Sequence, residues 1–100
     1  MEAESLARSA TSDSHPPAGL SAELEVLWLA RAGRWDQAHD ACQDLPDPAG
    51  AWIHAWLHRQ EGDEGNAAYW YARARKPVPP PGQTLEDEWL EIARALAGRR

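Results

Sequence analysis

Apolar residues recur every three to four positions through most of the chain from residue 20 onward, which is the spacing of one face of an α-helix. Proline, glycine and capping residues divide this pattern into segments, and none of them alternates apolar and polar residues as a half-buried strand does. The predicted helices occupy about 22–32, 34–45, 48–61, 65–75 and 84–98. The pattern therefore predicts an all-α protein of about five helices.

Local sequence signals mark the helix ends. Ser21, Asp47 and Asp63 stand where a side-chain oxygen can accept a hydrogen bond from the first turn of the following helix. Gly33 and Gly62 are predicted to end the helices that precede them, because glycine adopts the left-handed backbone conformation without steric cost. These signals predict short turns, and helices joined by short turns pack as antiparallel neighbours.

The last predicted helix has the cleanest amphipathic pattern. Thr84 and Asp87 approximate a capping box at its start. We expect its outer face to be acidic and its inner face to be apolar. The predicted inner face comprises Leu85, Trp89, Ile92, Ala93 and Leu96.

The two ends of the chain differ in composition. Residues 1–19 are rich in Ser, Ala and Pro with little apolar periodicity, so we expect this segment to be disordered. Residues 20–100 are expected to form a single helical-repeat domain. Its predicted parts are a hairpin at 20–46, a hairpin at 47–76, a stiff proline-rich linker at 77–83 and a capping helix at 84–98.

The two predicted hairpins align with each other, since Gly33 and Gly62 lie 29 residues apart in similar local sequence. The second copy resembles the tetratricopeptide repeat (TPR) family at Ala55, Gly62, Asp63, Ala67, Tyr71, Ala74 and Pro77. The first copy keeps Gly33, Trp35 and Ala38 and departs from the family pattern at Val26, Cys42 and Leu45. The resemblance covers residues 20–81. It implies a TPR-like stack of two antiparallel hairpins whose open end is shielded by the last helix.

The run HAWLHRQEGDEGNAAYWYARA, residues 54–74, is also similar to a family of small helical proteins without an established activity. This second resemblance implies a helical fold and carries no chemistry.

Composition and charge limit the partners. The net charge of −6 argues against a nucleic-acid partner, because binding to phosphates depends on clustered Lys and Arg. Six tryptophans and no phenylalanine indicate that indole rings anchor the core, each with one N–H to satisfy. Cys42 is the single cysteine, which favours a reducing compartment, and we expect a cytoplasmic location. No stretch approaches the roughly 18 apolar residues of a membrane span, so no membrane partner is expected.

His54 and His58 stand four residues apart and therefore share one face of the third predicted helix. The favoured interpretation is that they satisfy a semi-polar helix interface by hydrogen-bonding to Glu61, Asn66, Tyr69 or a helix end. Histidines at this spacing can also hold one metal ion.

The alternative is a site for Zn²⁺ or another divalent metal that is centred on His54, His58 and Glu61. Two imidazoles and one carboxylate from a single helix make a weak site, so a further ligand has to come from elsewhere. The second predicted helix offers His39 and Asp36 for that purpose.

A contact surface is predicted from exposed polar and aromatic residues. Tyr69 and Arg73 are four residues apart on the side of the fourth predicted helix away from its apolar stripe, and Asn66 lies one turn earlier. Asp36 and Asp40 form an acidic stripe on the second predicted helix. We expect a small interaction module, monomeric or homodimeric, that binds an unidentified protein or peptide.

The sequence favours a protein without enzymatic activity or a cofactor. Ala55 follows His54 where a metalloprotease motif requires a catalytic glutamate. Cys42 takes the place of a packed aromatic in the repeat pattern, so we expect it to be a buried, inert thiol. No nucleophile motif and no phosphate-binding loop is present.

Overall fold

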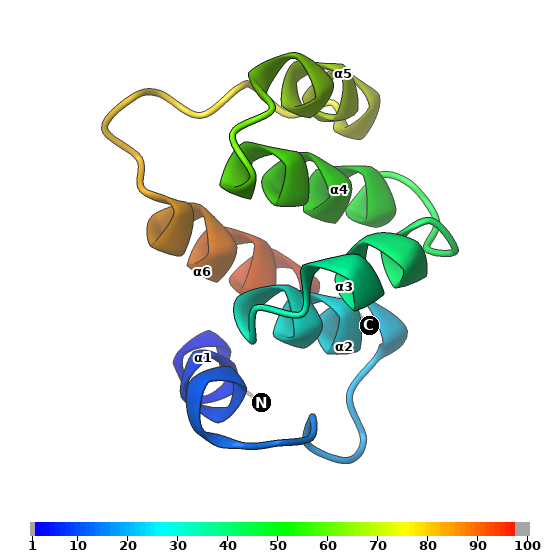
Figure 1. Cartoon of the computed structure of the whole chain (residues 1–100), viewed down its shortest axis with the longest axis vertical. Coiled ribbons are helices and arrows are strands. Elements are labelled where there is room, and N and C mark those ends of the chain that lie inside the picture. The colour runs from blue at the N-terminus through cyan, green and yellow to red at the C-terminus, as the bar shows by residue number, and fades with distance from the viewer. Residues whose placement is uncertain (1, 98–100) are drawn as a thin grey trace.

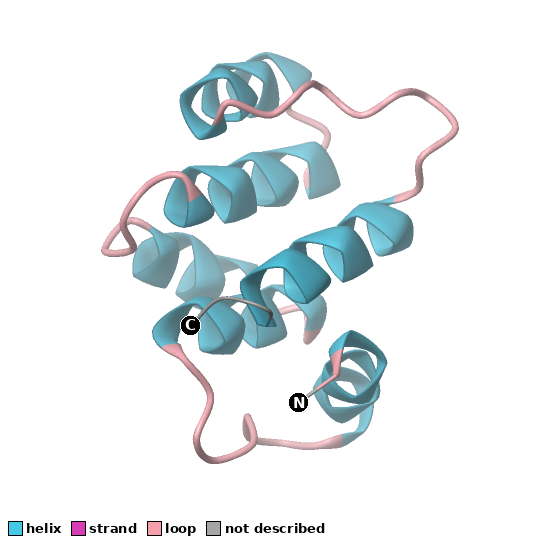
Figure 2. Cartoon of the chain, turned by 180° about the vertical axis from the view of Figure 1, so that it is seen from behind, coloured by secondary structure: helices cyan, strands magenta, loops and turns pink. Residues whose placement is uncertain are grey.

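The computed structural model describes residues 2–97 and, over that range, contains six α-helices and no strand (Figures 1 and 2). The helices are α1 (Ala3–Ser12), α2 (Ala22–Arg31), α3 (Trp35–Cys42), α4 (Ala49–Gln60), α5 (Glu64–Ala74) and α6 (Leu85–Ala97). The all-α prediction is confirmed, and the predicted number of helices was one too low. The predicted end of the last helix at residue 98 lies outside the described residues.

Helix α1 forms within the segment 1–19, for which the sequence predicted disorder, so that prediction is wrong for Ala3–Ser12. The stripe that α1 buries against α2 and α6 consists mainly of alanines, which give a weak hydrophobic signal in the sequence. Leu6 is its one large apolar residue and is 1% exposed. Ser9 adds a tertiary bond, because its hydroxyl accepts the indole N–H of Trp28 at 3.0 Å.

The predicted start signals of α2 and α5 and the predicted end signals of α2 and α4 are observed. Ser21 and Asp63 each accept the backbone N–H of the residue three positions later, at 3.2 Å in both cases. Gly33 and Gly62 have φ angles of 82° and 89°, a region in which an L side chain is strained. These local interactions fix the turn between α2 and α3 and the turn between α4 and α5.

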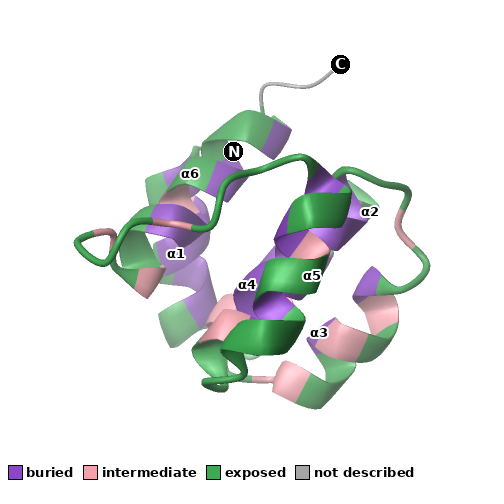
Figure 3. Cartoon of the chain, turned by 90° about the horizontal axis from the view of Figure 1, so that it is seen from above, coloured by how far each residue is buried: buried purple, intermediate pink, exposed green. Residues whose placement is uncertain are grey.

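Helix α4 occupies the centre of the molecule. Every residue from Ala49 to His58 is buried, because α2, α3, α5 and α6 all pack against this helix (Figure 3). Helix α6 packs on α1, α2 and α4, and it also contacts α5 through a hydrogen bond of 2.7 Å from Tyr71 to Glu88. The expectation that the last helix shields the open end of the hairpin stack stays a prediction. The linker after α5 returns the chain to the side of α4, where α6 begins (Figure 1).

The tryptophans join the helices, as their composition predicted. Five indole N–H groups donate to a group on another helix, and each such bond stabilises the fold by about 1 kcal/mol in addition to the apolar area that the ring buries. The donor and acceptor pairs are Trp28–Ser9, Trp35–Leu57, Trp52–Glu88, Trp56–Leu85 and Trp89–Leu27.

Candidate metal centre

Three histidines from two helices meet between α3 and α4. His54 and His58 lie one turn apart on α4, and His39 faces them from α3. One ring nitrogen from each of the three lies within 4.8 Å of the other two. His54 and His58 are 5% and 7% exposed, and His39 is partly exposed. The sequence identified all three as candidate ligands, and the fold brings them together.

The contact between His39 and His54 is unusual for a hydrogen-bonded interface. Their Nε2 atoms are 2.9 Å apart, so one ring has to donate a proton to the lone pair of the other. Burial, followed by the electrostatic effect of His39 and His58, lowers the pKa of His54 to about 4. His54 is therefore neutral at neutral pH, which is the protonation state that binds a metal.

His58 is held by Glu61 in the last turn of α4. Its Nδ1 lies 2.7 Å from a carboxylate oxygen of Glu61, so Nδ1 carries the proton and donates it to that oxygen. The Nε2 atom of His58 then keeps its lone pair. Glu61 is thus engaged as the partner of a histidine, in the arrangement that orients metal ligands in many proteins. It also belongs to a second, more exposed group with metal-binding spacing, formed by His58, Glu61 and Asp63, so its role as a direct ligand stays a prediction.

Two tryptophans fix the outer rings of this cluster. The Trp35 ring stacks on His39 with centroids 4.7 Å apart, and its N–H donates to the carbonyl oxygen of Leu57 at 2.9 Å. The Trp70 ring stacks on His54 with centroids 3.8 Å apart. The sequence placed both tryptophans on apolar stripes and gave no sign of their contact with histidines, because that contact forms only when α3, α4 and α5 pack together.

The predicted alternative partners of the histidines are engaged elsewhere. Asn66 donates its amide to Asp63 at 3.0 Å, as part of the cap of α5. Tyr69 is 56% exposed on the outer face of α5. Asp36 and Asp40 are exposed on α3, and among the described residues neither joins a group with metal-binding geometry.

Arg73 and Asp47 form an ion pair between α5 and the turn that precedes α4, with an N–O distance of 2.8 Å. The prediction that Asp47 caps α4 is therefore wrong, since Pro48 occupies the N-cap position without a side-chain cap bond. The Arg73 guanidinium also lies 4.8 Å from the centroid of the Trp70 ring. Tyr69 and Arg73 were predicted as an exposed pair, and both are exposed; Arg73 in addition links α5 to the start of α4.

A pocket of about 320 Å³ adjoins the histidine cluster. Its floor is part of α4 and includes His54, and its walls come from the ends of α3 and α5. Cys42 borders the pocket but is 2% exposed, and burial raises the pKa of its thiol to about 12. The prediction of an inert, buried thiol is consistent with both values.

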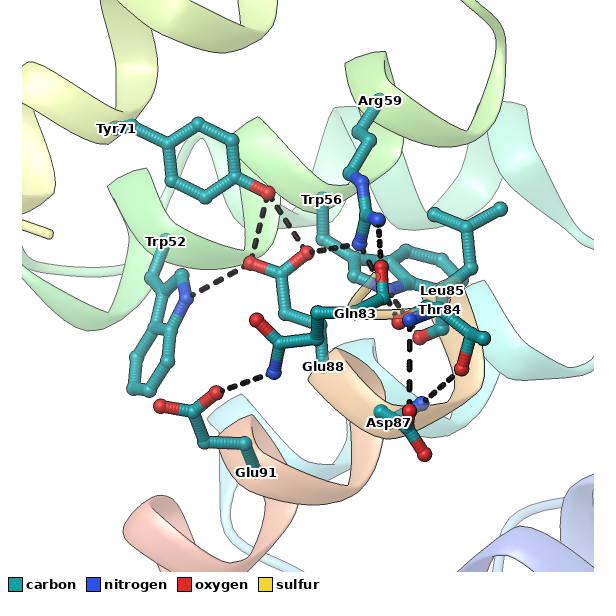
Figure 4. A network of polar contacts seen from close by, with 10 residues as sticks. All are labelled: Trp52, Trp56, Arg59, Tyr71, Gln83, Thr84, Leu85, Asp87, Glu88 and Glu91. Carbon is teal, nitrogen blue, oxygen red and sulfur yellow. Dashed lines mark hydrogen bonds and ion pairs between the residues drawn. The ribbon is translucent and has the colours of Figure 1, made fainter. Parts of the chain in front are cut away.

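A second buried polar cluster was missed by the sequence analysis. Glu88 of α6 is 2% exposed, although the outer face of this helix was predicted to hold its acidic residues. Its carboxylate accepts hydrogen bonds from Tyr71 at 2.7 Å, from Arg59 at 3.0 Å and from Trp52 at 3.3 Å (Figure 4). Burial, followed by the bond to Glu88, raises the pKa of Tyr71. The available signal was the position of Glu88 between Leu85 and Ile92, on the apolar stripe itself.

Comparisons of the chain with protein-family models, with curated proteins and with solved structures found no match. The resemblance of residues 20–81 to the TPR family therefore stays a prediction. Within residues 2–97, no helix is both long enough and apolar enough to cross a membrane.

Proposed function

We propose that the protein binds a divalent metal ion, with Zn²⁺ the best match, through His39, His54 and His58. The observation that supports this most strongly is the convergence of three ring nitrogens to within 4.8 Å between two helices. Three imidazoles are an established zinc ligand set, and neutral imidazole also suits the neighbouring transition metals. The low pKa of His54 and the orientation of His58 by Glu61 support the same function.

The spacing of the cluster suits a bound ion after small movements. Tetrahedral zinc with bonds of about 2.0–2.1 Å holds its ligand nitrogens about 3.4 Å apart. The 2.9 Å separation between His39 and His54 therefore opens by about half an ångström, and wider separations in the cluster close. A bound ion also replaces the contact between the two rings by two metal–nitrogen bonds, and the ring that donated its Nε2 proton either carries that proton on Nδ1 instead or releases it to solvent. This exchange supplies the driving force for binding.

Isothermal titration calorimetry with zinc chloride tests the proposal. We expect one ion per chain, and we expect His39→Ala to weaken binding by about 100-fold or more, since it removes a direct ligand. His39 is partly exposed, so this variant is expected to fold. His15→Ala is the matched control, because His15 lies on an exposed loop away from the cluster. Zinc binding that is absent at millimolar concentration, or equal in both variants, rejects the proposal.

The second candidate function is the interaction module, and the exposure of Tyr69 favours it. A tyrosine that is 56% exposed on α5 presents apolar area to a partner at low entropic cost. The acidic stripe of Asp36 and Asp40 on α3 offers charge for the same purpose. A cytoplasmic protein or peptide is the proposed partner, in keeping with the single buried cysteine. The test is mass spectrometry of the proteins that are retained on the immobilised chain. Loss of a retained partner in the Tyr69→Ser variant supports this function, and unchanged retention speaks against it.

A further inference from the structure

Three histidines leave a tetrahedral metal ion one ligand short. Among the described residues, no fourth histidine, thiol or carboxylate belongs to the group formed by His39, His54 and His58. The carboxylate of Glu61 is hydrogen-bonded to Nδ1 of His58. An ion at this site therefore keeps one coordination position for a molecule from solution, as metal sites that act on or bind a ligand do.

The adjoining pocket provides the space for such a molecule. Its volume of about 320 Å³ falls within the range of small-ligand pockets. His54 borders the pocket and also belongs to the histidine cluster, so one ligand of the proposed ion lies at the pocket. Arg73 borders the same pocket and is its one cationic side chain.

We propose that this pocket binds a small dicarboxylate, with one carboxylate on the open position of the metal ion and the other on Arg73. The inference rests on the proposed metal-binding function. It follows from charge, since His54, a ligand of the proposed dication, and the guanidinium of Arg73 border one pocket, and a molecule with an anionic group at each end complements both charges. The negative charge of Glu61 offsets part of the charge of the ion, and the remaining positive charge matches two carboxylates.

Arg73 is well placed to receive a carboxylate. Its guanidinium has five N–H donors, and a single hydrogen bond to a carboxylate, that of Asp47, is recorded. Contact with the Trp70 ring at 4.8 Å keeps the guanidinium plane beside the pocket. The same Trp70 ring stacks on His54, so one rigid aromatic residue positions both anchors of the ligand.

Asp47 is the competitor of the ligand. Its ion pair with Arg73 is exposed, with the two side chains 42% and 46% accessible, and exposed ion pairs contribute little to stability. A carboxylate of the ligand can therefore displace Asp47, whose side chain turns to solvent. Arg73 is thus expected to strengthen ligand binding, and Asp47 is expected to weaken it.

The experiment uses the full chain loaded with Co²⁺, whose visible absorption reports coordination, and titrates it with succinate as the probe. We expect a saturable spectral change with one succinate per ion. Arg73→Gln is expected to weaken succinate binding by about 10-fold or more, and Asp47→Asn to strengthen it severalfold. Butyrate, which lacks the second carboxylate, is expected to bind wild type no better than succinate binds Arg73→Gln.

The two variants are matched, because each breaks the same ion pair and any effect of that pair on stability is common to both. If Co²⁺ binds and succinate leaves the spectrum unchanged, the dicarboxylate inference is overturned while the metal function stands. Equal binding of succinate and butyrate, or weaker succinate binding in both variants, overturns it as well. Absence of Co²⁺ binding rejects the metal function and this inference together.

Discussion

Helix α4 carries two buried polar clusters on different faces, and they are satisfied in different ways. Toward α6, one carboxylate, that of Glu88, meets donors from Tyr71, Trp52 and Arg59, including a full positive charge (Figure 4). Toward α3, three imidazoles face one another, and the closest contact joins the Nε2 atoms of His39 and His54. The first cluster is complete with the residues of the chain. The cation proposed above would complete the second.

This difference shows that the balance of donors and acceptors around a buried polar group indicates whether the group stabilises the fold or binds a ligand. Donors and acceptors that balance, as around Glu88, point to an interaction that holds α6 and the linker against α4. Arg59 extends that interaction, because it also donates to the backbone carbonyls of Gln83 and Thr84. A set of good metal ligands without a balancing charge, as around His54, points instead to a site for a ligand.

The largest expected effect is the loss of the balanced cluster. Glu88→Ala leaves the Arg59 charge and the hydroxyl of Tyr71 without their acceptor, so we expect unfolding free energy to fall by about 3–5 kcal/mol. Urea denaturation measures this change. Glu91→Gln on the exposed side of α6 is the control and should stay within about 0.5 kcal/mol of wild type. A loss below about 1 kcal/mol for Glu88→Ala would show that the cluster does not hold α6.

Zinc is expected to stabilise the protein through the other cluster alone. At a free zinc concentration about 100 times the dissociation constant, the unfolding free energy should rise by about 2.7 kcal/mol. Thermal or urea denaturation with and without zinc measures it. His39→Ala should lose the increase, whereas Glu88→Gln should keep it despite its lower stability. An equal increase in His39→Ala would place the ion elsewhere.

Low pH is expected to weaken the metal-free protein through His54. The folded-state pKa of this residue is about 4 and its ordinary value is 6.5, so the unfolded chain binds the proton more readily. The contribution of His54 to the unfolding free energy is complete above pH 6.5 and falls as the pH drops to 4, by about 3 kcal/mol. Urea midpoints across this range measure it against His54→Gln, which cannot titrate. Identical pH profiles for the two proteins would contradict the assignment.

The smallest expected effect concerns the carboxylate that orients His58. Glu61→Gln keeps an acceptor for the Nδ1 proton and removes the negative charge, so zinc binding should weaken by about 10-fold with little change in stability. Calorimetry measures the affinity and urea denaturation the stability. Because Glu61 lies outside the ligand set in this arrangement, a loss of zinc binding as large as that of His39→Ala would make it a direct ligand instead.

The sequence predicted the parts of the fold that depend on neighbouring residues. Ser21 and Asp63 cap their helices, and Gly33 ends α2, because each effect acts within one turn of the chain. Residues of α1 were misread for the opposite reason. The alanine stripe of α1 and Leu6 are buried only because α2 and α6 pack against them, and these helices are distant in the sequence.

The candidate site was predictable in its residues and not in its geometry. His54 and His58 share a face because of their spacing, and His39 was recognised as a possible third ligand. The 2.9 Å contact of His39 with His54 depends on how α3 packs on α4, which periodicity does not specify. Glu88 was assigned to the exposed face because the sequence does not show that Arg59 and Tyr71 lie beside it. Their hydrogen bonds are what allow this carboxylate to be buried on the apolar stripe.

The stacking of two indoles on the histidine cluster also gives the protein an optical property. Trp35 and Trp70 lie against His39 and His54, so a proton or a paramagnetic ion at these rings will quench their fluorescence. Trp89, buried between α2 and α6, supplies emission from a region remote from the cluster. Unlabelled protein can therefore report the occupancy of its own site through the intensity and wavelength of its emission.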